Sequence, residues 1–378
     1  MIRYIGYFDK QDSAIKRNYV TSAANKMGYI ANAISESFPI EIISNSSVVE
    51  DKFRFYKAEN KILSSGVSVH LPFSWGGNGN ISRTLKLIWH TLYLFLFLLF
   101  KIRKDETIIV YHSLGYFSTI LLAKKIKKFK LILEVEEIYS DVINNNGYYR
   151  KLENLMFEAA DAYIFSTELL NQKINLSNKP YITIYGSYTI NRTSTNKYED
   201  NLIHIVYAGT FDPRKGCIEA IHSVEYLPSN YHLHVCGFGS DINVNRVKDE
   251  IAKTSSNTKA TISYEGLLLG KDYTNLLLRC HIGLSPQDPN ASFNATSFPS
   301  KILSYMSNGL NVVSVGIKSI LVSPLAKSLY FYEGNSPKEI ARAILSVDIK
   351  KDNRDVIEKL SDEFIVEIKN LIDELNNN

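Results

Sequence analysis

The first half of the chain alternates short apolar runs with longer stretches that are apolar at helical spacing. The apolar runs predict strands at 2–8, 40–44, 107–111, 130–135, 162–166 and 181–185. Apolar positions three and four residues apart predict helices at 17–38, 115–128 and 148–160. Residues 51–73 alternate less cleanly and are expected to add one or two short strands. Because strands and helices alternate from the first residues onward, the pattern indicates βαβ units and a parallel sheet.

The same alternation resumes after residues 189–201, which are rich in Asn, Ser and Thr and are typical of a linker. Strands are expected at 202–208, 232–236, 261–264, 281–284, 311–315 and 329–332, and helices at 215–226, 242–252, 273–279, 299–307, 337–345 and 352–375. The pattern predicts an α/β fold of two doubly wound, Rossmann-like domains facing across a cleft, with ligands at the carboxyl ends of the strands. We place the domains at 1–188 and 189–350, followed by a C-terminal helix at 351–378 that packs back on the first domain.

Residues 87–100 form the most apolar stretch of the chain. At about 1.5 Å per residue this stretch is about 21 Å long, short of a ~30 Å hydrocarbon core, which disfavours a membrane-spanning helix. A buried core helix and a helix lying in a membrane surface both remain open. In the second case Trp89 and Tyr93 lie at the interface, and Phe95 and Phe97 enter the lipid. Anionic headgroups then meet the flanking basic residues Arg83, Lys86, Lys101, Arg103 and Lys104.

Length and composition fit two globular domains. The chain has 378 residues, is 45% hydrophobic and carries a formal net charge of +4, which gives no case for nucleic-acid binding. Cys217, Cys236 and Cys280 lack the spacing of a zinc site or a disulfide framework and are expected to be reduced core residues. The N-terminal segment is predicted to be a first strand and not a signal peptide, so we expect a cytoplasmic protein.

Residues 294–309 combine a polar loop, Pro299, an apolar-periodic helix and Gly309. Proline suits the first turn of a helix, where its missing N–H costs nothing. The remaining free N–H groups and the positive end of the helix dipole favour an anion. An ordinary loop before a helix is the alternative interpretation of this stretch.

Three further loops follow predicted strands of the second half. In 207–216 a glycine precedes adjacent cations, which suits a diphosphate, and Lys215 is the better placed of the two. Residues 235–240 contain the glycine turn at Gly237, which is also typical of a plain βα turn. Residues 264–268 offer backbone groups to a base.

These motifs together carry a resemblance to a known family. The order Y-A-G-T-F-x-x-x-K-G, H-V-C-G-F-G, Y-E-G and S-F-P-S-K-I-L-S-Y-M-S-N-G-L-N-V-V-S is similar to the donor half of GT-B glycosyltransferases. The match is best with the large retaining, GT4-like family that includes many bacterial capsule and O-antigen enzymes. It covers about residues 202–345, and over 1–190 it rests on βα alternation and the apolar helix.

The resemblance implies a set of donor-binding residues. Gly209 resembles the glycine that lets the donor phosphate approach, and Lys215 resembles the diphosphate lysine. Glu265 and Leu267 fall in the base-binding loop. The remaining expected donor contacts are Thr210, Gly237, Thr296, Ser297, Ser300, Lys301 and Ser304.

Three positions depart from the family pattern. The family usually has two glutamates seven residues apart, one at the sugar and one at the ribose, and here these positions are Thr296 and Ser304. The arginine commonly found after the first glycine is Thr210. A serine hydroxyl binds a ribose hydroxyl more weakly than a carboxylate does. A catalytic assignment therefore does not transfer from the family to Thr296.

The first half offers acid and base candidates. His112 follows a predicted strand on the side of the expected cleft, and a histidine titrates near neutrality. Glu137 lies in a loop after the next strand and is the better general base within the cluster formed by Glu134, Glu136, Glu137 and Asp141. A hydrogen-bonded packing histidine and a solvated acidic loop are the alternatives. No metal or other cofactor is expected, because helix dipoles and lysines can hold the phosphates.

The sequence thus favours a glycosyltransferase at the inner face of the cell membrane. It would move a hexosyl residue from a nucleotide diphosphate sugar, with a UDP-sugar such as UDP-galactofuranose as one candidate, to a glycan or polyprenyl-linked acceptor. A non-catalytic scaffold of the same fold and a sugar-nucleotide epimerase are the alternatives. An epimerase needs no lipid-facing helix, so the stretch at 87–100 speaks against it.

Overall fold

The protein consists of two compact units. The structure, a computed structural model, describes residues 1–10, 13–142, 147–193, 197, 198, 200–291, 294 and 296–377. One unit contains Met1–Ser187 and Asp362–Asn378, and the other contains Tyr188–Ser361. The chain therefore changes unit at Tyr188, beside the predicted linker, and again within its last helix.

The first unit is built on an eight-stranded sheet with the order β10-β9-β8-β7-β1-β2-β5-β4. Neighbouring strands are parallel except for the edge pair β4 and β5, which is antiparallel. The strands are β1 (Ile2–Gly6), β2 (Ile40–Ser44), β4 (Glu59–Ser64), β5 (Val67–Leu71), β7 (Thr107–Tyr111), β8 (Lys130–Val135), β9 (Ala162–Phe165) and β10 (Tyr181–Thr183). A separate ribbon pairs β3 (Phe55–Tyr56) with β6 (Ser74–Trp75). The predicted parallel sheet is confirmed.

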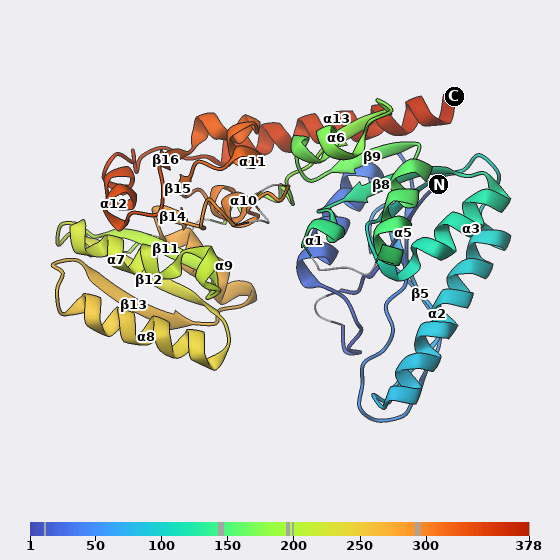
Figure 1. The fold of residues 1–378 in the computed structure, drawn as a ribbon, viewed down its shortest axis with the longest axis horizontal. Helices are drawn as coiled ribbons and strands as arrows, with labels where there is room; N and C mark the ends of the chain where they lie inside the picture. The colour runs from blue at the N-terminus through green and yellow to red at the C-terminus, as the bar shows by residue number, and fades with distance from the viewer. Residues whose placement is uncertain are drawn as a thin grey trace. The chain divides into compact units, whose positions relative to one another are not determined.

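Helices cover both faces of this sheet (Figure 1). They are α1 (Thr21–Ser35), α2 (Asn80–Lys101), α3 (Phe117–Lys127), α4 (Tyr139–Val142), α5 (Gly147–Ala159), α6 (Glu168–Ile174) and the C-terminal part of α13 (Arg354–Asn377). Leu98 of α2, Phe117 of α3 and Met156 of α5 share one buried cluster, so these three helices lie on the same face. The ring of Phe364 lies 6.0 Å from that of Tyr29 in α1. The C-terminal helix therefore packs on the first unit, as expected.

Helix α2 is longer than the apolar stretch that marked it in the sequence. It has 22 residues and begins at Asn80, and by length and composition it is the one helix in the described part of the chain that could cross a membrane. Its N-terminal half is tied to the unit, because the buried Lys86 amine donates to the carbonyls of Val48 (2.7 Å) and Gly77 (3.0 Å). Leu94 and Leu98 continue the buried face into the core, and the opposite face of the helix is exposed.

The second unit is built on a six-stranded parallel sheet with the order β13-β12-β11-β14-β15-β16. Its strands are β11 (Ile203–Thr210), β12 (Tyr231–Phe238), β13 (Thr261–Gly266), β14 (Ile282–Ser285), β15 (Asn311–Val315) and β16 (Tyr330–Tyr332). Its helices are α7 (Cys217–Ser223), α8 (Asp241–Ser255), α9 (Gly270–Arg279), α10 (Lys301–Ser307), α11 (Lys318–Leu321) and α12 (Pro337–Leu345). Helices α7, α8 and α12 pack in a row along this unit (Figure 1). The three cysteines are buried and free, as expected.

Candidate functional site

The carboxyl ends of β11 and β12 approach each other closely, and glycines make this possible. A Cβ on Gly237 would overlap the carbonyl oxygen of Gly209. A Cβ on Gly209, whose φ is 155°, would lie 3.1 Å from the amine of Lys301. The missing side chain therefore leaves open the space in front of that amine, where a ligand can enter.

Lys301 is the central cation of this strand edge. The residue is half-buried, and its amine lies 4.1 Å from the centre of the Tyr207 ring, in a cation–π arrangement. Burial, with a smaller effect from the nearby positive charge of Lys215, lowers the pKa of Lys301 to about 7. An anion bound at this amine would relieve both effects and favour the ammonium form.

The two adjacent cations of the loop after β11 have different surroundings. Arg214 is held by Asp212, with 2.6 Å between Nη2 and Oδ2. The hydrogen bond from Arg214 lowers the pKa of Asp212 to about 2. Lys215 instead lies close enough to Lys301 to act on its pKa. A Cβ on Gly216, at φ 74°, would overlap the carbonyl oxygen of Pro286, which fixes the backbone beyond Lys215.

Helix α10 is anchored in the sheet through Tyr305. The Tyr305 hydroxyl accepts a hydrogen bond of 2.8 Å from the backbone N–H of Ala208, and a Cβ on Gly283 would overlap the Tyr305 ring. The preceding residue of the same helix, Ser304, has its Oγ 3.2 Å from the hydroxyl of Tyr273. These tyrosine contacts fix the position of Lys301 and Ser304 relative to the end of β11, and the sequence motifs did not reveal them.

The loop before α10 differs from its prediction in one respect. The helix begins at Lys301 and has seven residues, whereas it was expected to begin at residue 299. The preceding backbone forms a turn instead, in which the N–H of Ile302 donates to the carbonyl of Pro299 (3.0 Å). Thr296 is buried, Ser297 is half-buried and Ser300 is exposed. Their predicted contacts with a donor remain predictions.

Glu265 lies within β13 and not in the loop after it. Its Oε1 is 2.7 Å from Nδ1 of His234 and 2.5 Å from Oγ of Ser263. Burial acts to raise the pKa of Glu265, but the hydrogen bonds with His234 and Ser263 outweigh it and lower the pKa. Leu267 is exposed beyond the strand. A base-binding role for either residue stays a prediction.

In the first unit, His112 follows β7 and is fully buried. Its Nε2 lies 3.2 Å from Oε1 of Glu153 in α5, and its ring stacks on Tyr139 with 4.7 Å between centroids. Burial acts to raise the pKa of Glu153, but its interaction with His112 and two backbone N–H groups lower it overall. These contacts match the packing interpretation. The His112 side chain has no exposed surface. A catalytic role for His112 stays a prediction.

Glu137 lies half-buried in the loop after β8, as predicted. Its role as a general base is untested and stays a prediction. The side chain of Asp141, which was placed in the same cluster, lies outside the described residues.

Glu134 has surroundings that the sequence did not reveal. It is fully buried at the end of β8, accepts a hydrogen bond from the hydroxyl of Tyr4, and lies 3.9 Å from the amine of Lys26. That amine pairs with Glu136 at 2.5 Å. Burial, followed by the charge of Glu136, raises the pKa of Glu134 to about 8. Glu134 therefore holds its proton more tightly than an ordinary carboxyl group does.

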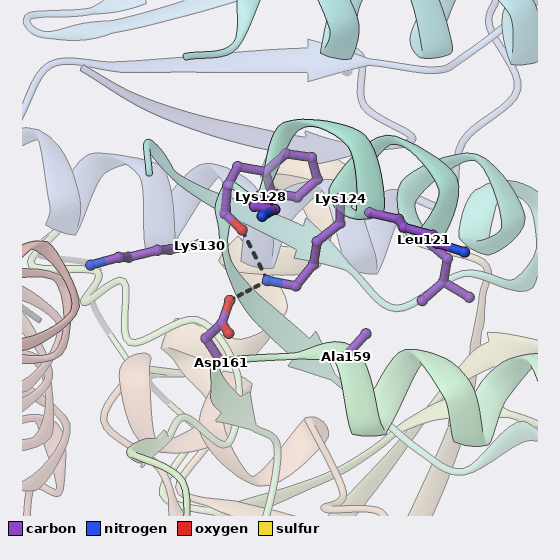
Figure 2. Close-up of a pocket in the computed structure, with 8 residues that line it drawn as sticks. Leu121, Lys124, Lys128, Lys130, Ala159 and Asp161 are labelled. Carbon is purple, nitrogen blue, oxygen red and sulfur yellow. Dashed lines mark hydrogen bonds and ion pairs between the residues drawn. The ribbon is translucent and has the colours of Figure 1, made fainter. Parts of the chain in front are cut away.

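A basic hollow of about 480 Å³ lies elsewhere in the first unit (Figure 2). The amine of Lys124 donates to Asp161 (2.5 Å) and to the carbonyl of Phe129 (2.9 Å). Lys128 and Lys130 also line the hollow. Lys130 is the first residue of β8, so the hollow is at the amino end of that strand. Because ligands of doubly wound sheets bind at carboxyl ends, we do not assign the substrate to it.

Comparison with solved structures covers the whole chain. An E. coli structure of trehalose-6-phosphate bound with UDP-2-fluoro glucose matches with a TM-score of 0.68 and 10% identity, over 99% of this chain and 98% of that one. The α,α-trehalose 6-phosphate synthase of Burkholderia multivorans gives 0.65 and 10%, over 100% and 96%. The chain has the GT-B fold.

Anabaena HepE, solved in complex with UDP and glucose, has the same GT-B fold, with a TM-score of 0.63 and 11% identity over 100% of this chain and 99% of that one. No protein-family profile matches the chain, and no curated protein matches it in sequence. At 10% to 11% identity these structures show the shared GT-B architecture. They do not single out the GT4-like family of the sequence resemblance.

Proposed function

We propose that the protein is a glycosyltransferase that uses a nucleotide diphosphate sugar, most simply a UDP-hexose. The observation that carries this proposal is the position of the Lys301 amine, which faces the space left by the missing side chain of Gly209 and has Lys215 close by. This cationic position lies at the carboxyl end of β11, where ligands of doubly wound sheets bind. Structures of the same fold were solved with UDP or a UDP-sugar.

In this proposal Lys301 and Lys215 neutralise the diphosphate. Gly209 and Gly237 let the phosphate approach the backbone, and Ser304, held by Tyr273, is the candidate for the ribose hydroxyls. Two amines and a close backbone provide point charges and donors where negative charge grows as the diphosphate leaves. No carboxylate occupies position 296 or 304, so the protein would act on the sugar mainly by orientation and charge.

The reaction breaks the bond between the anomeric carbon and the diphosphate oxygen and forms a bond from that carbon to an acceptor oxygen. The diphosphate leaves with the bonding electrons, and the acceptor loses a proton. In a retaining reaction the leaving phosphate takes this proton, and in an inverting reaction Glu137 is our candidate base. The GT4-like resemblance favours the retaining course.

The exposed face of α2 supports a membrane-surface location and a lipid-linked acceptor. Six of its exposed apolar side chains follow one stripe, namely Ile81, Leu85, Ile88, Leu92, Leu96 and Phe100, and Leu87 is exposed as well. Trp89 and Tyr93 instead face the unit, through hydrogen bonds to the carbonyl of Phe73 (2.8 Å) and to His70. Phe95 and Phe97 are partly buried against the core. An interfacial helix with this stripe in lipid would place a polyprenyl-linked glycan next to the first unit.

The enzyme proposal is tested by release of UDP from a panel of UDP-sugars. We expect slow hydrolysis of at least one UDP-hexose by the full chain, because many transferases pass the sugar to water when the acceptor is absent. The Lys301→Met variant should lose at least tenfold of that rate, since it removes the charge that meets the leaving diphosphate. Unchanged hydrolysis in Lys301→Met would contradict the proposed phosphate site.

A non-catalytic scaffold of the same fold is the second candidate. It is favoured by the buried Thr296 and by Ser304, which stand where the family resemblance expects carboxylates. The two candidates differ in one measurement. A scaffold binds UDP but cleaves no UDP-sugar, whereas the enzyme binds UDP and also forms UDP from a UDP-sugar. Binding without turnover across a panel that includes UDP-glucose, UDP-galactose and UDP-galactofuranose would favour the scaffold.

A further inference from the structure

Two histidines on β12 face a carboxylate on the neighbouring edge strand β13. His232 and His234 are two residues apart on one strand, so their side chains lie on the same face of the sheet. Glu265 of β13 lies on this face as well. One donor atom from each of these residues falls within 4.8 Å of the other two.

The hydroxyl of Ser263 lies among the three donor atoms. It is 2.8 Å from Nε2 of His232, 3.2 Å from Nδ1 of His234 and 2.5 Å from Oε1 of Glu265. The three donors thus converge on one small volume. Two imidazole nitrogens and one carboxylate form a donor set that Zn²⁺ takes in proteins, with a fourth position left for water or a hydroxyl.

The nitrogen of each ring that does not face this volume also has a partner. Nε2 of His234 lies 2.8 Å from Nδ1 of His204, and Nε2 of His204 lies 3.0 Å from Oδ1 of Asp200. Nδ1 of His232 lies 2.6 Å from Oγ1 of Thr261. Such outer hydrogen bonds orient metal-binding imidazoles and fix which nitrogen is free of its proton.

Burial favours the neutral form of both rings, and neutral imidazole is the form that binds a metal. Burial lowers the pKa of His232 to about 4, and burial also lowers the pKa of His234 against the opposing effect of Glu265. The site is not sealed, since His232 and Glu265 are only half-buried. An ion can therefore reach the donors from solvent.

We propose that His232, His234 and Glu265 bind one divalent transition-metal ion, with Zn²⁺ as the best-fitting ion, and that His204 and Asp200 position His234. The metal replaces the hydrogen bonds that Ser263 makes with the three donors. The ion ties β12 to the edge strand β13. None of the proposed phosphate-binding residues contributes a donor, and Glu265 is the one ligand that the sequence resemblance also assigns to the base-binding loop.

The test uses the full chain after removal of metal with a chelator. Titration calorimetry with ZnCl₂ should show one ion per chain with a micromolar or lower Kd. The variants His232→Gln and Glu265→Gln should each weaken binding by at least tenfold. The matched control is His222→Gln, because His222 pairs with Glu250 and has no part in the cluster, and it should bind Zn²⁺ as the unaltered chain does.

A second readout distinguishes positioning from coordination. His204→Asn should weaken Zn²⁺ binding by about tenfold, as loss of an outer hydrogen bond typically does. The unaltered chain should also rise in Tm with added Zn²⁺, because an ion that binds the folded state stabilises it. This measurement needs no variant to fold. Absence of a Tm rise together with no saturable binding, or binding that is unchanged in Glu265→Gln and His232→Gln, would overturn the proposal.

Discussion

The amine of Lys301 lies against the Tyr207 ring at 4.1 Å, and a Cβ on Gly209 would come within 3.1 Å of that amine. Lys301 and Gly209 lie almost a hundred positions apart in the chain and together form one cationic position at the end of β11. Because the amine is partly withdrawn from water, its pKa falls to about 7. A diphosphate would restore the charge.

The affinity for UDP should therefore depend on pH above neutrality. Without a ligand, Lys301 has a pKa of about 7, and a bound diphosphate raises that pKa. At a pH between the unbound and the bound pKa of Lys301, binding of UDP therefore takes up a proton. Affinity is full below the lower value and falls as pH rises. We expect Kd to increase between pH 7.5 and 9, by up to about tenfold per unit, the limit for one proton. Calorimetry in buffers of different ionisation enthalpy measures both quantities.

The matched variant for this pH effect is Lys301→Met, which has no amine to titrate. It should bind UDP weakly and with a nearly flat Kd over the same range. A slope in Lys301→Met equal to that of the unaltered chain would show that another group takes up the proton.

Gly209→Ala should weaken UDP binding. The added methyl group would crowd the Lys301 amine and fill the space in which the phosphate approaches. We expect at least a tenfold higher Kd, measured by calorimetry. Gly28→Ala is the control, since a Cβ there meets only Phe8 at an ordinary 3.8 Å. Equal affinities in the two variants would contradict the role given to Gly209.

The stability of the protein should depend on Glu134 between pH 5 and 8. This carboxyl group has a pKa raised to about 8 in the folded state, so between its unfolded value and pH 8 the folded state holds a proton that the unfolded state has lost. The stability due to this proton is present at low pH and is lost as pH rises, by at most about 1.4 kcal/mol per unit. Glu134→Gln cannot titrate and should show a smaller fall, measured by urea unfolding at several pH values. An identical pH profile in the variant would contradict the burial of a protonated Glu134.

The exposed stripe of α2 should bind anionic membranes. The double variant Leu92→Ser with Leu96→Ser removes two exposed leucines from the stripe and should reduce flotation with phosphatidylglycerol vesicles several-fold. Ile242→Ser is the control, because Ile242 is 80% exposed but lies on α8 of the second unit. Equal flotation of the double variant and the control would count against a lipid-facing α2.

Local patterns were sufficient where residues contact their sequence neighbours. The strand at 311–315 and the helix at 337–345 have the predicted limits, because apolar periodicity and the flanking Gly309 and Pro337 mark them. The glycine and the lysine of the loop after β11 were also recognisable as a pair, since they lie within ten residues of each other, and their contact with phosphate stays a prediction.

Long-range contacts explain most of what the sequence did not reveal. The sequence did not indicate that His112 lies against Glu153 or that Glu265 pairs with His234, because each contact joins two separate elements. The alternation of His232 and His234 along one strand is the only local sequence signal of the proposed metal site. The buried face of α2 was hidden too, since Lys86 and His90 are polar residues that the fold buries.

The central claim is that the edge of β11 binds the diphosphate of a nucleotide sugar. Calorimetric titration of UDP into the unaltered chain, Lys215→Ala and Arg214→Ala tests it most directly, because Arg214 is the adjacent cation held by Asp212. We predict saturable binding by the unaltered chain, at least tenfold weaker binding by Lys215→Ala, and a smaller change in Arg214→Ala. No binding of UDP at millimolar concentration, or the same affinity in all three proteins, would contradict the account.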